Sequence, residues 1–179
     1  ISSYSNSAEN KIQEELADKL GKLAGYEDYS LFLCNSGAEA NENALKLASF
    51  HNGKKKVVYF SESFHGRTSA AVAVTDNPKI VAPVNKSDNF IKCEFNNSEE
   101  LEKIFAENQN EISAVILEGI QGVGGINLLT EDFILKIEKL CKENNSILIL
   151  DEVQSGYGRS GKFFAHQEFV IKSGLISNS

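Results

Sequence analysis

The chain has 179 residues, enough for one sizeable core, and its 41% hydrophobic and 24% charged content is typical of a globular domain and excludes a disordered or collagen-like chain. Eighteen Lys and Arg against 25 Asp and Glu give a net charge of −7, and the longest basic run is residues 54–56, which argues against a nucleic-acid-binding protein. No apolar run is long enough to cross a membrane and the first residues show no signal peptide, so we expect a cytoplasmic protein without a membrane partner.

The predicted elements alternate between helices and strands. The first is a helix with Ser7 as its N-cap and Gly25 as its stop. A strand over residues 29–34 leads through a tight turn into a second helix, which ends near Phe50. Residues 56–74 then form a buried strand, a loop at its carboxyl end and a short helix.

The second half of the chain repeats this alternation. Ser98 caps a helix, residues 112–117 form a strand, Thr130 caps the next helix, and residues 146–150 form the last strand. This order predicts one α/β unit with a mostly parallel sheet and helices on both faces. The tail over residues 168–179 fits the pattern less well.

The last predicted strand runs directly into two carboxylates, Asp151 and Glu152. A buried acid is costly without a cationic or protonated partner, and the ligand crevices of open α/β sheets lie at the carboxyl ends of strands. We therefore expect Asp151 to face a ligand. Residues 156–161 (GYGRSG) carry the letters of a dinucleotide fingerprint, but the two acids separate them from the strand and no clear helix follows, which argues against that interpretation.

Residues 35–40 (NSGAEA) predict an anion site. Ser36 can cap the following helix, Gly37 lets the backbone approach a ligand closely, and the first N–H groups of the helix can bind a phosphate. An ordinary capped helix would explain the same residues.

Two further strand ends carry candidate ligand-binding residues. Phe64 can stack on a flat ring and Arg67 can bind a carboxylate through two hydrogen bonds. The alternative is a core phenylalanine and a surface ion pair. Glu118 precedes glycines that would let the backbone turn against a ligand; the alternative is a solvated acid beside a loose loop.

The three histidines are scattered and lack neighbours at metal-ligand spacing, so no metal site is predicted. We expect His65 and His166 to be structural hydrogen-bond partners. Ser36 or Ser155 with His65 and Asp151 would make a hydrolase triad, but neither serine lies in a Gly-x-Ser-x-Gly elbow.

The three cysteines, Cys34, Cys93 and Cys141, are odd in number and far apart. We interpret them as reduced thiols that pack in the interior. The chain begins at Ile1 and contains no Met, so we expect it to be part of a longer protein.

Four motifs together resemble, in order and spacing, those of the class III aminotransferases, which use pyridoxal phosphate (PLP), and among these the acetylornithine and succinylornithine enzymes. The motifs are residues 35–42 (NSGAEANE), 64–68 (FHGRT), 118–122 (EGIQG) and 151–159 (DEVQSGYGR). The resemblance implies the large domain of a fold-type I PLP-dependent transferase over residues 1–167. The family pattern stops after Gln167, and we expect residues 168–179 to be a piece of the small C-terminal domain that follows missing residues.

The resemblance implies cofactor-binding residues in three of the motifs: Ser36, Gly37, Ala38, Phe64, Asp151, Val153 and Gln154. Asp151 would keep the ring nitrogen protonated, which makes the ring an electron sink. Phe64 and Val153 would pack on the two faces of the ring, and Gln154 would hydrogen-bond its phenolic oxygen.

By the same resemblance, Arg67 would bind a substrate carboxylate and Glu118 would lie near the entrance. Family members commonly have a proline and a second acid where this chain has Gly119 and Val123. Because that acid can pair with the substrate-binding arginine in ornithine-type enzymes, Val123 should leave Arg67 free.

The Schiff-base lysine of the family follows the sheet strand after the Asp151 loop. Neither Lys162 nor Lys172 has the surrounding sequence of that lysine, so we expect the chain to lack it. The resemblance implies a homodimer that moves the side-chain amino group of N-acetylornithine or N-succinylornithine to 2-oxoglutarate in arginine biosynthesis. The alternatives are an ornithine or 4-aminobutyrate aminotransferase and, from another class, a non-catalytic module that binds a phosphate ligand.

Overall fold

A computed structural model describes residues 10–178, and the chain divides into two units, residues 1–35 and 36–179. The first unit contains the helix α1 in its described part, and the second contains all described strands and the remaining helices. Among the described residues, no helix is both long and apolar enough to cross a membrane.

Helix α1 (Lys11–Ala24) ends at Gly25, as predicted, and this glycine has the positive φ of 73° typical of a C-terminal helix stop. The side chain of Asn10 caps its start by accepting a hydrogen bond from the Ile12 N–H at 3.0 Å. Ser7, the predicted cap, lies outside the described residues.

Residues 29–34 do not form the strand that their apolar side chains predict. Leu31 and Leu33 are half-buried, whereas Phe32 and Cys34 are exposed. An apolar run becomes a strand where a neighbouring strand completes its backbone hydrogen bonds, and the sheet is built from later residues.

Cys93 and Cys141 are buried, as predicted, and burial raises the pKa of the Cys93 thiol to about 12 and also raises that of Cys141. The prediction of an interior position is wrong for Cys34, because the segment that carries it is not a buried strand.

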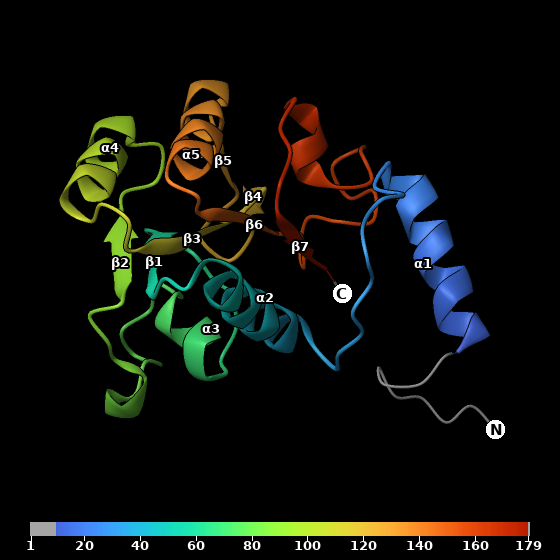
Figure 1. Cartoon of the computed structure of the whole chain (residues 1–179), viewed down its shortest axis with the longest axis horizontal. Helices are drawn as coiled ribbons and strands as arrows, with labels where there is room; N and C mark the ends of the chain where they lie inside the picture. The colour runs from blue at the N-terminus through green and yellow to red at the C-terminus, as the bar shows by residue number, and fades with distance from the viewer. Residues whose placement is uncertain (1–9, 179) are drawn as a thin grey trace. The chain divides into compact units, whose positions relative to one another are not determined.

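The second unit is built on a parallel sheet of five strands in the order β2-β1-β3-β6-β7 (Figure 1). In chain order its strands are β1 (Lys56–Phe60), β2 (Phe90–Cys93), β3 (Ile112–Glu118), β6 (Ile147–Asp151) and β7 (Leu175–Ser177). A short antiparallel pair follows β3 and consists of β4 (Ile120–Gln121) and β5 (Asn127–Leu128). Strand β7 brings part of the predicted tail into the sheet beside β6.

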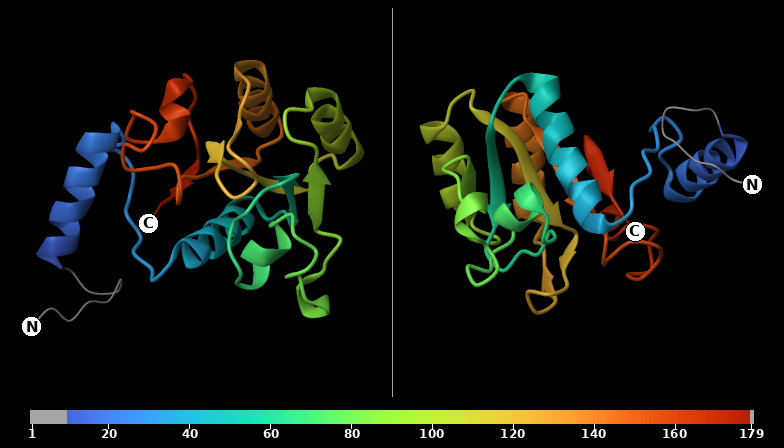
Figure 2. Two further views of the ribbon diagram at one scale, coloured as in Figure 1. Left: turned by 180° about the vertical axis from the view of Figure 1, so that it is seen from behind. Right: turned by 90° about the horizontal axis from the view of Figure 1, so that it is seen from below.

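Helices cover both faces of the sheet, as Figure 1 and both views of Figure 2 show. One face carries α2 (Gly37–Asn52) and α3 (Ser69–Ala73), and the other carries α4 (Ser98–Glu107) and α5 (Glu131–Glu143). Two short 3-10 helices, η1 (Pro83–Asn85) and η2 (Ala165–Glu168), lie in connections. The prediction of an α/β unit with a parallel sheet between helices is confirmed.

The core has two layers because alternate side chains of a strand point to opposite faces. In β3, Val115 and Leu117 pack in the cluster that includes residues of α4 and α5, and Ala114 and Ile116 pack in the cluster that includes residues of α2. Every residue of β3 is buried, which is why its sequence is almost continuously apolar.

Asn97, and not Ser98, caps α4. The Asn97 side-chain oxygen accepts a hydrogen bond from the Glu100 N–H at 3.1 Å, and Ser98 is the first helical residue. We expect Asn97→Ala to lower the free energy of unfolding by about 0.5–2 kcal/mol, the usual range for an N-cap, and Ser98→Ala to leave it nearly unchanged. Urea denaturation of both variants measures the difference, and a larger loss for Ser98→Ala would contradict this assignment.

Candidate active site

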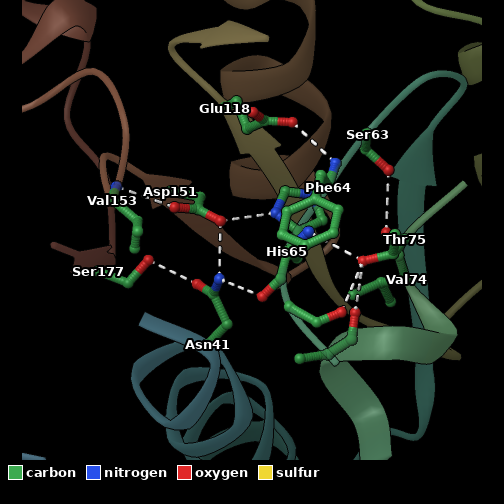
Figure 3. A network of polar contacts seen from close by, with 12 residues as sticks. Asn41, Ser63, Phe64, His65, Val74, Thr75, Glu118, Asp151, Val153 and Ser177 are labelled. Atoms are coloured by element: carbon green, nitrogen blue, oxygen red, sulfur yellow. Dashed lines mark hydrogen bonds and ion pairs between the residues drawn. The ribbon is translucent and has the colours of Figure 1, made fainter. Parts of the chain in front are cut away.

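The order of the strands defines where the candidate site lies. From β1, the chain adds β2 on one side of the sheet and then β3, β6 and β7 on the other. The direction in which strands are added therefore reverses between β1 and β3. Ligands of open α/β sheets bind at the carboxyl ends of strands beside such a reversal. The loop after β1 carries Phe64 and His65, β3 ends in Glu118, and β6 ends in Asp151, so the sheet brings these predicted residues to one edge (Figure 3).

Asp151 is the centre of the polar network in Figure 3, and its side chain is 3% exposed. Its Oδ2 accepts hydrogen bonds from Asn41 Nδ2 and His65 Nδ1, both at 2.7 Å, and its Oδ1 accepts one from the Val153 N–H at 3.0 Å. No lysine or arginine of the described residues forms an ion pair with it. The site therefore holds a buried carboxylate that hydrogen bonds stabilise but that no lysine or arginine in the described part of the chain neutralises.

His65 is a structural hydrogen-bond partner, as the sequence predicts, and its partner is Asp151 itself. Its backbone N–H donates to Thr75 Oγ1 at 2.9 Å, and its ring Nε2 is buried without a hydrogen-bond partner among the described residues. A proton on Nδ1 suits this environment, because Nδ1 lies against the Asp151 carboxylate, which can only accept.

The predicted anion site lies at the start of α2. Ser36 is the N-cap, and its Oγ accepts a hydrogen bond from the Glu39 N–H at 3.2 Å. Gly37 begins the helix so close to Val153 that a Cβ added to it would lie 2.6 Å from both Val153 methyl carbons. The predicted phosphate-binding turn and the loop after β6 are therefore in direct contact.

Gly37→Ala is expected to lower the free energy of unfolding by about 1–3 kcal/mol, the usual cost of overpacking. The loss arises from the clash with Val153, because Ala is otherwise the better helix residue. Urea denaturation of Gly37→Ala in the wild-type and Val153→Ala backgrounds measures it. An equal loss in both backgrounds would contradict this cause.

Phe64 and Glu118 are joined by a hydrogen bond. Glu118 is 4% exposed, and its carboxylate accepts bonds from the backbone N–H groups of Phe64 at 3.0 Å and Gly122 at 3.2 Å. Burial raises the pKa of Glu118, and the Asp151 charge adds to this, although His65 and the two backbone donors oppose it. The solvated-acid alternative is excluded by this burial, whereas a role of Glu118 in substrate binding stays a prediction.

The other predicted site residues are more open to solvent. Phe64 and Val153 are half-buried, so the core alternative for Phe64 does not hold, and Gln154 is exposed. Arg67 is exposed and forms no ion pair with any described residue, which leaves its guanidinium available for a carboxylate. Their roles toward ligands stay predictions.

Glu152 organises a second buried cluster, which the sequence did not reveal. Its Oε1 accepts hydrogen bonds from the His166 N–H at 2.9 Å and ring Nδ1 at 2.7 Å, and its Oε2 accepts them from the Ala165 N–H at 3.0 Å and Ser155 Oγ at 2.5 Å. The cluster fixes the loop after Asp151 onto η2. A second acid directly after a buried strand was the signal that could have pointed to it.

Asn41 is the other residue that sequence reasoning missed. It contacts Asp151 directly and is 1% exposed. Its spacing before the buried residues Ala44, Leu45 and Ala48 puts an amide in the apolar stripe of α2, which was a readable signal.

The alternative chemistries find no support in these contacts. His65 Nε2, the atom that would activate a serine, has no hydrogen-bond partner among the described residues, and Ser155 donates to Glu152 instead. In the described part of the chain, no group of His, Cys, Asp and Glu is arranged to hold a metal ion. Residues 153–162 form turns and bends, so the glycines there open no helix.

Comparison with known proteins agrees with this geometry. The family profile described as aminotransferase class-III matches residues 1–178. The chain is 39% identical over 174 residues to the acetylornithine aminotransferase of Bacillus subtilis, which covers 97% of the chain and 44% of that relative. It is 43% identical over 166 residues to the acetylornithine aminotransferase of Archaeoglobus fulgidus, covering 92% of the chain and 43% of that relative.

Solved structures give the same result. A Bacillus anthracis aminotransferase superposes with a TM-score of 0.91 at 27% identity, over 99% of this chain and 45% of that one. A taurine:2-oxoglutarate aminotransferase of Bifidobacterium kashiwanohense, solved in complex with PLP and glutamate, superposes with a TM-score of 0.90 at 25% identity, over 98% of this chain and 44% of that one.

The chain belongs to the class III aminotransferases. It spans a little under half the length of these relatives. The family match continues to residue 178, and the predicted boundary after Gln167 is not tested by it. The assignment of residues 168–179 to a small C-terminal domain stays a prediction.

Proposed function

We propose that this chain forms the PLP-binding part of an aminotransferase that moves the side-chain amino group of N-acetylornithine or N-succinylornithine to 2-oxoglutarate. The observation that carries the proposal is the Asp151 carboxylate, which is buried, accepts three hydrogen bonds and lacks a lysine or arginine partner among the described residues. A protonated ring nitrogen is the cationic partner that such a carboxylate requires.

The residues present fit the cofactor at both ends. Ser36, Gly37 and Ala38 offer the start of a 16-residue helix to its phosphate. The tight contact between Gly37 and Val153 supports a site in which the phosphate end and the ring end are held by touching segments. Phe64 and Val153 would pack on the ring, and Gln154 would bind its phenolic oxygen.

When bound, the cofactor supplies an electron sink for the substrate carbon that loses its proton. Asp151 keeps the proton on the ring nitrogen, and His65 holds the Asp151 carboxylate in place. Arg67 binds the substrate carboxylate, and Glu118 fixes the backbone of Phe64. These roles divide the site into groups that hold the cofactor and one exposed cation that selects the substrate.

The lysine that the resemblance requires would follow the strand after the Asp151 loop, which is β7 in this sheet. Strand β7 runs parallel to β6, and its Ser177 is in register with Asp151, so a residue that follows β7 would come from the same edge as Asp151. Lys162 and Lys172 are both exposed, which supports neither of them in this role.

The choice of substrate is supported by the acetylornithine aminotransferases among the relatives at about 40% identity. Arginine biosynthesis, a homodimer and a cytoplasmic location belong to the same proposal, as the resemblance implies.

The test uses the full-length protein that contains this chain. After incubation with PLP and removal of the excess, we expect visible absorbance that borohydride bleaches and amino transfer to 2-oxoglutarate from an acylated ornithine. Higher kcat/KM with ornithine or 4-aminobutyrate would overturn the substrate. A colourless protein, or one that binds PLP without transferring any amine, would overturn the enzymatic function and favour a phosphate-binding module.

A further inference from the structure

Asn41 connects the ends of two strands and the loop after a third through one buried amide group. Its Nδ2 donates to Asp151 Oδ2 at 2.7 Å and to the backbone oxygen of His65 at 2.8 Å, and its Oδ1 accepts from Ser177 Oγ at 2.5 Å. The partners lie at the ends of β6 and β7 and in the loop after β1 (Figure 3).

The orientation of this amide is fixed by its surroundings. Its nitrogen faces a carboxylate and a carbonyl, which can only accept, and its oxygen faces a hydroxyl, which can donate. A flipped amide would place its oxygen against two acceptors. Both N–H groups of the Asn41 amide therefore donate hydrogen bonds to protein groups, and its oxygen accepts one.

As a result, the two carboxylate oxygens of Asp151 differ in the number of hydrogen bonds that they accept. Oδ2 accepts from both Asn41 and His65, whereas Oδ1 accepts, among the residues that the structure describes, only from the Val153 N–H. Each carboxylate oxygen has two lone pairs, so Oδ1 keeps capacity for one further donor. The Ser177 hydroxyl polarises the Asn41 amide, which strengthens its donation to Asp151.

We propose that Asn41, supported by Ser177, is a positioning residue that occupies Asp151 Oδ2 and leaves Oδ1 for the ring nitrogen of the cofactor. The proposal rests on the proposed function, since it concerns the same cofactor. It adds that the Ser177 hydroxyl at the end of β7 is linked to the ring-binding carboxylate through the Asn41 amide of α2.

The test compares the same type of substitution, Asn to Asp, at two positions of α2. Asn41→Asp keeps the shape and the acceptor for Ser177 but places a second carboxyl group beside Asp151. Asn43→Asp is the control, because Asn43 Nδ2 donates at 2.8 Å to the Glu39 backbone oxygen and not to Asp151. The measurement is the dissociation constant of PLP in the full-length protein, by absorbance titration from pH 6 to 9, with thermal unfolding as the check of folding.

For Asn41→Asp we expect PLP affinity about ten- to a hundredfold weaker at pH 8, the effect of one hydrogen bond to a charged group. The loss should shrink as the pH falls, because two adjacent carboxyl groups then share a proton that again donates to Asp151. Asn43→Asp should bind as the wild type does. Wild-type affinity and pH dependence in Asn41→Asp would overturn the proposal.

If Asn41→Asp does not fold, Ser177→Ala tests the proposal instead, because it removes only the hydroxyl that donates to the Asn41 amide oxygen. We expect it to weaken PLP binding about two- to tenfold, as for a neutral hydrogen bond, with a wild-type pH dependence. Unchanged affinity in that variant would overturn the proposal. A wild-type protein that takes up no PLP would instead overturn the proposed function, because the inference concerns only the ratio between variant and wild type.

Discussion

Asp151→Asn in the full-length protein is expected to lower kcat by about 10²–10³-fold, the effect of removing one preorganised electrostatic contact from an active site. The substitution keeps the shape of the side chain but removes its charge. An amide cannot hold a proton on the ring nitrogen of the proposed cofactor, so the ring becomes a weaker electron sink. Steady-state kinetics at saturating substrate, with absorbance to quantify bound PLP, measures the effect.

The control for this variant is Asp132→Asn, which alters an exposed carboxylate in the first turn of α5. Its kcat should equal that of the wild type. Asp151→Asn is expected to lose some stability as well, because its NH₂ group must face a hydrogen-bond donor on one side or the other. A folded, PLP-loaded Asp151→Asn protein with wild-type kcat would contradict the role of this carboxylate.

Glu152→Ala is expected to lower the free energy of unfolding by about 3–5 kcal/mol, the range seen when one partner of a buried ionic contact is removed. The Glu152 carboxylate accepts four hydrogen bonds, from two backbone N–H groups, the His166 ring and Ser155. Its removal leaves these donors buried and unsatisfied. Loss of this size takes a large share of a typical stability and would lower Tm by roughly 10 °C, which calorimetry measures.

The matched control is Glu143→Ala, which removes an exposed glutamate that forms an ion pair with Lys139 at 3.8 Å; its effect should stay within about 0.5 kcal/mol. Burial alone would raise the pKa of Glu152, but the hydrogen bonds from His166, Ser155 and two backbone N–H groups lower it below its ordinary value of 4.5. The associated stability is therefore present above pH 4.5 and is lost as the pH falls through the folded pKa. Urea unfolding of wild type and Glu152→Gln should differ most at neutral pH and converge in acid; a constant difference would contradict this linkage.

The sequence predicts the central strands well and the edge strands poorly. Residues 56–60, 112–117 and 146–150 are apolar runs because helices cover both of their faces, and burial leaves a clear pattern. Strand β2 has four residues, one of them the exposed Lys92, and β7 has three residues after Gly174. Segments this short show almost no hydrophobic periodicity. Their conformation depends on pairing with neighbouring strands, and the sequence does not reveal which strands pair.

The residues of the candidate site also divide into those that the sequence predicts and those that it does not. Asp151, Gly37 and Glu118 were found because strand ends and helix starts are visible in the sequence and chemistry concentrates there. Asn41 was missed because its partner Asp151 is 110 residues away and no local pattern records that pairing. The motif containing Asn41 was recognised as a whole, but the resemblance assigns roles only to Ser36, Gly37 and Ala38.

The hydrogen bond between Ser177 and Asn41 joins residues 136 positions apart, and that between Asn41 and Asp151 joins residues 110 positions apart. Closing such long loops is slow, because the entropy of the intervening chain is lost before the contact forms. During synthesis, α2 therefore leaves the ribosome long before the strands that complete its polar contacts. The Asn41 amide therefore stays hydrated until β6 and β7 are in place, and any delay in pairing β7 with β6 prolongs its exposure to water.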